Sequence, residues 1–190
     1  HAKAQVFHFD AAWAHSAQNL LSALRCGLPA GIQIFRVARA KEGFHARYSA
    51  VGKRYVYNIY EGYAPPYKSR YCWSLGRRKL DVKKMNEAAA GLLGEHDFTA
   101  FSANRGHEED NPVKNLRLLK VSRRGREIKI STEGSGYLYK MVRIISGALV
   151  DVGLGKLSAA EIRGILEGKK RTNLIQTAPS CGLFLEKVFY

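Results

Sequence analysis

The chain has 190 residues, of which 46% are hydrophobic and 25% are charged, a balance typical of an ordinary globular protein. Its 31 lysines and arginines outnumber its 16 aspartates and glutamates, and the net charge of +15 favours a polyanionic partner such as RNA, DNA or an anionic membrane. No apolar run approaches the roughly 18 residues of a membrane-spanning helix, so a nucleic acid is the favoured partner and no membrane association is expected.

The first forty residues predict two strands and one helix. Residues 6–9 (VFHF) and 32–40 are apolar enough to form strands. Between them, Ser16 is a predicted N-cap, and residues 17–28 carry apolar side chains at helical spacing.

Residues 44–60, FHARYSAVGKRYVYNIY, form the most informative stretch of the chain. Apolar and aromatic side chains alternate with basic or polar ones, which predicts a strand with one buried face. Lys53 and Arg54 directly precede Tyr55, so the other face would present cations that neutralise phosphates beside rings that stack on bases. The alternative is a strand whose aromatic side chains only fill the core.

The rest of the chain predicts strands interleaved with helices. The expected strands are 70–75, 116–122, 127–132 and 183–189, and the expected helices are 82–94, 137–152 and 158–167. Arg-Arg-Gly between the second and third of these strands predicts a hairpin, Ser158 and Glu161 predict a capping box, and 103–112 is typical of a polar loop. This order predicts an α+β fold, an antiparallel sheet with helices on one face and the other face left for RNA.

Arg143 is the first candidate site residue, because it lies inside an otherwise apolar predicted helix. A buried charge without a partner is very unfavourable, so this arginine needs an anion or a water-filled cleft. A fixed arginine beside a cleft usually pairs with a carboxylate or a phosphate. The alternative is an arginine at the helix edge that reaches solvent.

Four other candidates have simpler interpretations. Residues 177–183 are small and could let a ligand approach the backbone, but an ordinary turn is favoured. A helix cap at Gly94 followed by a charged loop is favoured over an acid–base cluster at 95–97. Asp10 is interpreted as structural, and no histidine is placed by the sequence to activate Cys181 as a nucleophile.

The cysteines and histidines show no metal or disulfide framework. Cys26, Cys72 and Cys181 lie far apart without CxxC spacing, and the six histidines show no HExxH or similar pattern. A reducing intracellular compartment is the simplest interpretation. Because the chain begins at His1 rather than Met, we expect the gene product to have further residues before it, a targeting peptide included if there is one.

Four segments, taken in this order, resemble the tRNA pseudouridine synthase A (TruA) family over nearly the whole chain. They are FHARYSA with KRYVYNIY, LDVKKMNEAAAGLLGEHDFTAF, YLYKMVRIISGALVDVG, and APSCGLFL with the closing strand. The resemblance implies an enzyme that isomerises uridine to pseudouridine in tRNA, cleaving the N-glycosidic bond of uracil, turning the base and rejoining it through carbon. It implies no cofactor and no metal, and a homodimer whose positive cleft holds the tRNA anticodon arm.

The resemblance also implies a fold and site residues. The fold has two ferredoxin-like halves, so residues 1–43 would be a remnant of the N-terminal lobe and 44–190 the C-terminal lobe. The family's base-stacking tyrosine falls on Tyr55, directly after Lys53 and Arg54, which would contact the substrate. A uridine in a stem must be flipped out before it can react, and a ring can hold it there. The arginine that pairs with the catalytic aspartate falls on Arg143, and the apolar residue under the base falls on Leu183.

The chain departs from the family at the catalytic aspartate itself. That aspartate lies in an Arg-Thr-Asp-x-Gly-Val-His-Ala stretch, and the first residues of this chain resemble the family segment just after that stretch. The matching position falls shortly before His1, and Asp10 matches a non-catalytic position. We therefore expect a fragment of a synthase that is inactive alone. The alternatives are a non-catalytic RNA-binding member that acts as a scaffold or chaperone, and a generic nucleic-acid-binding α+β module.

Overall fold

The computed structural model describes residues 1–103 and 111–190 and divides into two compact units. One unit comprises His1–Gln5 with Val51–Tyr190, and the other is Val6–Ala50. The polar loop predicted at 103–112 lies mostly outside the described residues. The assignment of lobes to 1–43 and 44–190 stays a prediction.

The Val6–Ala50 unit contains one helix, α1 (Ala17–Arg25), and no strand within its described residues. The Oγ of Ser16 accepts a hydrogen bond from the backbone N–H of Asn19 at 3.2 Å, which confirms the predicted N-cap. The strands predicted at 6–9 and 32–40 are wrong. Both segments are irregular and expose side chains, with Phe7 59% and Phe35 72% exposed. Apolar composition alone does not form a strand, because a strand needs a neighbour that pairs with its backbone.

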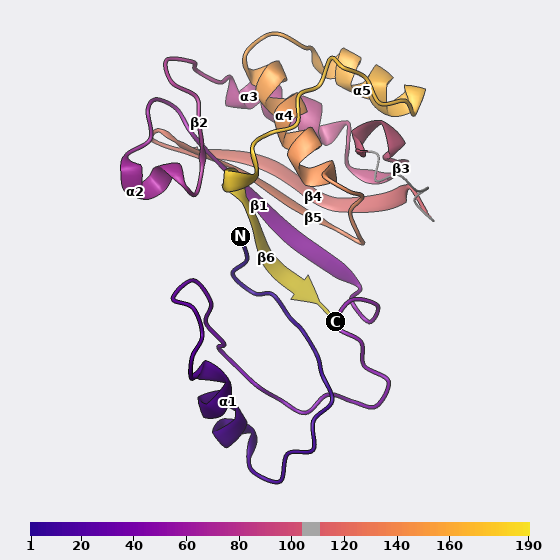
Figure 1. Ribbon diagram of the computed structural model, residues 1–190. Coiled ribbons are helices and arrows are strands. Elements are labelled where there is room, and N and C mark those ends of the chain that lie inside the picture. The colour runs from indigo at the N-terminus through magenta and orange to yellow at the C-terminus, as the bar shows by residue number, and fades with distance from the viewer. Residues whose placement is uncertain (104–110) are drawn as a thin grey trace. The chain divides into compact units, whose positions relative to one another are not determined.

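The unit that contains Val51–Tyr190 is built on a six-stranded sheet (Figure 1). Its strands are β1 (Gly52–Tyr60), β2 (Trp73–Ser74), β3 (Gly94–Asp97), β4 (Val113–Arg124), β5 (Glu127–Gly134) and β6 (Leu183–Phe189). Its helices are α2 (Pro66–Ser69), α3 (Val82–Ala90), α4 (Met141–Gly153) and α5 (Ala159–Gly168), with short 3₁₀ turns at η1 (Thr99–Phe101) and η2 (Ser180–Gly182).

The sheet has the connectivity of a ferredoxin-like fold. The strands lie in the order β2-β1-β5-β4-β3, and β6 pairs antiparallel with β1. The chain order β1, α3, β4, β5, α4, β6 combined with the spatial order β6-β1-β5-β4 is the βαββαβ arrangement. The α+β fold that the sequence predicted is therefore confirmed.

Helices α3, α4 and α5 cover one face of this sheet, as the sequence predicted (Figure 1). The core forms between that face and the helices. β1 contributes Tyr57 and Ile59, β5 contributes Ile128 and Ile130, and α4 is buried on nearly all sides. A helix that is apolar all round is a central core helix, which explains the composition of the 137–152 segment.

The strand and helix ends show where sequence patterns were sufficient. β6 spans the predicted residues, the β4–β5 hairpin forms, and Ser158 and Glu161 make the predicted capping box at α5. The predicted strand 44–60 is shorter in the structure, because β1 begins only at Gly52. The charged segment after α3 was predicted as a loop, but it is strand β3, which pairs with β4.

Candidate functional site

Tyr55 lies in the middle of β1 and faces the helix-covered side of the sheet. It stands opposite Thr132 of β5 and Leu185 of β6 in the strand register, and Thr132 is buried. Residues directly opposite in an antiparallel pair share a face, as do residues two apart in one strand. Tyr55 therefore shares the face of buried Tyr57, but it is only partly covered itself. The expectation that the ring of Tyr55 and both cations would share the face opposite the core is wrong, because Tyr55 lies on the core face of β1 and Arg54 on the other.

Leu183 lies on the same face, next to the two tyrosines. It pairs with Tyr57 in the register of β1 and β6, so it is the diagonal neighbour of Tyr55. Its side chain is half-buried and packs against the core. The structure thus brings together two residues that are more than a hundred positions apart in the sequence.

A second tyrosine, Tyr137, fixes the ring of Tyr55. The two rings meet edge to face, with centroids 5.1 Å apart and an angle of 84° between their planes. The Oη of Tyr137 lies 3.0 Å from the Oγ1 of Thr132, which holds Tyr137 in place. Burial raises the pKa of both tyrosines, so both hydroxyls are neutral near neutral pH. The sequence analysis missed Tyr137, because only the fold shows that it lies beside Tyr55.

Arg143 occupies the third position of α4 and is the one residue of that helix, all of it described, that is not buried. A cation in the first turn of a helix is disfavoured by the helix dipole, so this position calls for an anion nearby. Nε of Arg143 donates to the carbonyl oxygen of Ala178 at 2.7 Å. Within the described part of the chain, Arg143 makes no ion pair. Its other N–H groups are therefore available to a carboxylate or phosphate.

Tyr57 connects the neighbourhood of Arg143 to β1. Its Oη donates to the carbonyl oxygen of Pro179 at 2.6 Å, one residue beyond the carbonyl that Arg143 holds. Burial raises the pKa of Tyr57 well above its ordinary value, and the nearby charge of Arg143 opposes this rise only in part. Arg143, Tyr57 and the segment before β6 therefore lie together near the start of β6.

Small residues in the 177–183 segment are explained by packing. A Cβ on Gly182 would lie 2.6 Å from the carbonyl oxygen of Asn58 and 2.8 Å from the Tyr57 ring. Ala178 is fully buried and belongs to the hydrophobic core. The favoured interpretation of this segment, an ordinary turn, fits this packing better than a ligand cradle does.

Lys53 and Arg54 are not equivalent in the structure. Lys53 is half-buried and lies two residues before Tyr55, so it points to the same face. Arg54 points to the opposite face, where its Nη2 lies 2.7 Å from Oε2 of Glu133. Arg117 joins the same carboxylate at 3.5 Å. The structure thus places Lys53 with the candidate site and Arg54 in an ion-pair network on the face opposite α3, α4 and α5.

Two of the remaining candidates, Asp97 and Cys181, have structural partners, whereas Asp10 is exposed. Asp97 lies in β3, where it accepts hydrogen bonds from the N–H of Thr99 at 3.0 Å and its hydroxyl at 2.6 Å. Cys181 Sγ contacts the carbonyl oxygen of Cys72 at 3.3 Å. Among residues 1–103 and 111–190, no three histidine, cysteine or acidic side chains gather as metal ligands. In the same part of the chain, no helix is long and apolar enough to cross a bilayer.

The fold and the net charge together define a basic α+β protein with a ring, an arginine and an apolar side chain on the helix-covered side of its sheet. A sequence model described as tRNA pseudouridine synthase matches residues 88–190. The tRNA pseudouridine synthase A of Bacillus subtilis is 40% identical over 191 aligned residues, which cover all of this chain and 76% of the relative. The enzymes of the same name from Thermoanaerobacter pseudethanolicus and Clostridium kluyveri are 39% and 37% identical, and the chain covers 78% of each. The chain belongs to the tRNA pseudouridine synthase A family.

Proposed function

We propose that the protein isomerises uridine to pseudouridine in the anticodon arm of tRNA, and that these residues form the base-holding part of its active site. The reaction breaks the bond between N1 of uracil and C1′ of ribose and forms a bond from C5 to C1′. C5 loses a proton and N1 gains one, so no oxidant, cofactor or metal is required. The curated relatives carry tRNA pseudouridine synthase in their names, which supports this reaction class.

The position of Arg143 carries the proposal. The guanidinium lies at the start of a buried helix, is fixed through Nε by the Ala178 carbonyl, and forms no ion pair with a described residue of its unit. A fixed guanidinium next to an aspartate keeps that aspartate ionised at neutral pH and orients it in a two-point contact. We assign to Arg143 the role of pairing with the catalytic aspartate, which is not in the sequence of this chain as the family motif has it.

Tyr55 and Leu183 would hold the target base. A uridine in a stem has to leave its stack before C5 and C1′ can be reached, and the enzyme must offer surfaces that replace the lost stacking. The Tyr55 ring, oriented by Tyr137, supplies one surface, and the diagonal neighbour Leu183 supplies an apolar one. Lys53, on the same face, is placed to contact a phosphate next to the flipped nucleotide.

The test measures release of tritium from C5 of uridine in a labelled tRNA transcript. An active protein that includes these residues should release it, and Arg143→Ala in that protein should abolish release while tRNA is still bound. We expect the 190-residue chain alone to bind tRNA without release, because no carboxylate pairs with Arg143 in its described unit. Tritium release by the isolated chain would contradict this assignment.

The lack of a carboxylate paired with Arg143 among the described residues also favours a second candidate function. This candidate is a non-catalytic RNA-binding member of the family that acts as a scaffold or chaperone. The gene sequence before the His1 codon separates the two. An Arg-Thr-Asp stretch supports the enzyme, and a different residue in place of the aspartate supports the binder. Light scattering on the same protein, with and without tRNA, tests the homodimer that the family resemblance implies.

A further inference from the structure

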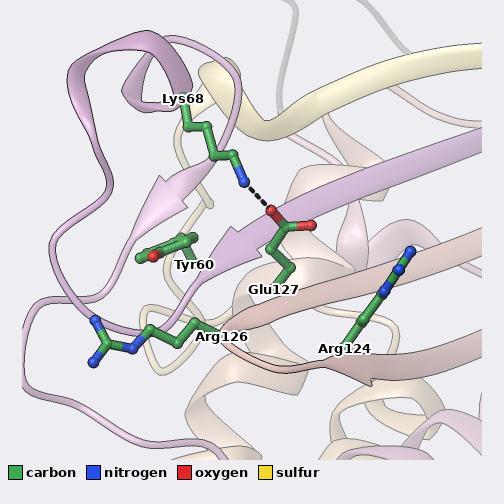
Figure 2. Close-up of a pocket in the computed structure, with 5 residues that line it drawn as sticks. All are labelled: Tyr60, Lys68, Arg124, Arg126 and Glu127. Carbon is green, nitrogen blue, oxygen red and sulfur yellow. Dashed lines mark hydrogen bonds and ion pairs between the residues drawn. The ribbon is translucent and has the colours of Figure 1, made fainter.

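A second group of cations and rings lies at the far end of β1, away from Tyr55. A pocket of about 400 Å³ is lined there by Tyr60, Lys68, Arg124, Arg126 and Glu127 (Figure 2). Tyr60 is five residues beyond Tyr55, which corresponds to about 17 Å along a strand at ~3.4 Å per residue. The pocket is therefore separate from the candidate active site.

The strand register places three of these residues in one row. Tyr60 of β1 stands opposite Glu127 of β5, and Glu127 stands opposite Arg124 of β4. Their neighbours Ile59 and Ile128 are buried on the side that α3, α4 and α5 cover, so this row faces the opposite side of the sheet. In the view of Figure 2, the Tyr60 ring lies between the side chains of Lys68 and Arg126.

The pocket keeps an unbalanced positive charge. Lys68 forms an ion pair with Glu127, so these two charges compensate each other. Arg124 and Arg126 are both exposed, and neither makes an ion pair within residues 1–103 and 111–190. Two guanidinium groups beside a partly open ring suit a phosphate backbone and a stacked base.

The β4–β5 hairpin that carries these arginines is fixed by hydrogen bonds to Glu61 and Leu80. Nη2 of Arg123 lies 2.7 Å from Oε1 of Glu61, whose side chain is buried, and 2.5 Å from the carbonyl oxygen of Leu80. The backbone N–H of Glu61 donates to the carbonyl oxygen of Arg126 at 2.8 Å. A fixed backbone lowers the ordering entropy that a flexible loop would lose on binding.

Gly62 lies beside two of the residues that line the pocket, Tyr60 and Arg126. A Cβ at this position would lie 3.6 Å both from the Tyr60 ring and from Nη1 of Arg126, and the residue has a φ of +109° that favours glycine. Tyr63 and Tyr67, which come soon after it in the chain, are 76% and 73% exposed. The surroundings of the pocket thus add two more rings that a nucleic acid could contact.

We infer that this pocket is a second tRNA-binding site, in which Arg124 and Arg126 contact backbone phosphates and Tyr60 contacts a base or sugar outside the target nucleotide. The choice of tRNA as ligand rests on the proposed function. Because the pocket is remote from Tyr55 and Arg143, it contributes affinity and orientation of the tRNA body without taking part in the isomerisation.

The test is the affinity of the 190-residue chain for an unmodified tRNA transcript, measured by fluorescence anisotropy over a range of salt concentrations. The pocket variant carries Arg124→Gln with Arg126→Gln. The control carries Lys83→Gln with Lys84→Gln, which removes the same charge from exposed positions on α3. We expect the pocket variant to bind roughly tenfold more weakly at 0.1 M salt and to lose about 1.4 from the slope of log affinity against log salt, at ~0.7 per phosphate contact. The control should bind like the parent.

A further pair of variants tests the ring, with Tyr60→Phe expected to bind like the parent and Tyr60→Leu more weakly. Equal affinity and salt slope of the pocket and control variants, with the parent bound to tRNA, would overturn this inference and leave the proposed function intact. Absence of tRNA binding by all chains would overturn both. The last measurement is binding to vesicles of phosphatidylcholine and phosphatidylserine. If the pocket variant loses vesicle binding but keeps the tRNA affinity of the parent, the ligand of the pocket is an anionic lipid surface and not RNA.

Discussion

Arg143 and Ala178 are joined by two hydrogen bonds that run in opposite directions. Nε of Arg143 donates to the carbonyl oxygen of Ala178 at 2.7 Å, and the N–H of Ala178 donates to the carbonyl oxygen of Arg143 at 3.1 Å. The first turn of α4 and the segment before β6 therefore fix each other. The direction of the guanidinium is set by main-chain atoms rather than by side chains that could rotate away.

Arg143→Lys should test this geometry separately from charge. Lysine keeps the positive charge but has neither Nε nor the planar fork, so it cannot hold Ala178 and a carboxylate at once. In an active protein that includes these residues, we expect uridine conversion to fall by roughly 100-fold or more, by analogy with loss of one preorganised donor. The tRNA affinity should stay unchanged. The matched control is Arg163→Lys on α5, where the arginine is exposed and pairs with Glu167, and equal activity of the two variants would contradict the assignment.

Gly147→Ala should disturb the same region through packing. A Cβ at Gly147 would lie 2.0 Å from the carbonyl oxygen of Gln176, so the segment that carries Ala178 would have to move off α4. We expect destabilisation of about 1–3 kcal/mol or more in the free energy of unfolding, the usual range for overpacking. Gly164→Ala in α5 is the control, because a Cβ there meets no atom within 4 Å. It should stabilise by up to about 1 kcal/mol through helix propensity. Urea unfolding measures the free energy of unfolding of both variants relative to the parent. A Gly147→Ala protein as stable as the parent would exclude the packing argument.

Tyr55→Ala should separate base holding from tRNA binding. The ring is fixed edge to face by Tyr137 and is the stacking surface proposed for the flipped base. Stacking is worth about 1–3 kcal/mol per base, so turnover should fall by roughly 5- to 150-fold. The tRNA affinity should change little, because it comes mainly from phosphate contacts and falls with salt. Tyr55→Phe keeps the ring and should retain most of the turnover. Salt-independent affinity would rule out the electrostatic account.

Sequence patterns were sufficient where one segment determines its own structure. The capping box at Ser158 and the turn between β4 and β5 each depend on residues a few positions apart, and both form as predicted. Sequence patterns failed where the secondary structure of a segment depends on a partner far away in the chain. Residues 6–9 and 32–40 are apolar but form no strand, whereas β3 has poor strand formers and exists because β4 offers its edge.

The candidate site shows the same division. The composition of the helix singled out Arg143, and its partly buried position in a buried helix agrees with the need for an anion. Its contact with Ala178 and the fixation of Tyr55 by Tyr137 join residues from different elements. No spacing rule in one sequence shows such contacts, because they depend on the strand register and the helix packing.

The pH dependence of stability should change when Asp97 is replaced. The pKa of Asp97 lies below its usual value because its carboxylate accepts hydrogen bonds from Thr99, the hydroxyl contributing more than the backbone N–H. The charge of Lys169, whose Nζ lies 3.6 Å from the carboxylate, lowers the pKa of Asp97 further. Because the pKa in the folded state is lower than in the unfolded state, the unfolded chain binds the proton first as pH falls. The stabilisation is therefore fully present above the unfolded pKa of about 4 and is lost as pH falls through the folded pKa.

In Asp97→Asn this stabilisation is absent at every pH. The difference in free energy of unfolding between parent and variant should be largest at about pH 7 and should shrink toward about pH 3. Urea unfolding at about pH 7, 5 and 3 measures it. Glu95→Gln is the control, because Glu95 lies in the same strand, is exposed, and makes no ion pair in the described part of the chain. A difference that stays constant across this range would show that the carboxylate of Asp97 gains nothing from Thr99 on folding.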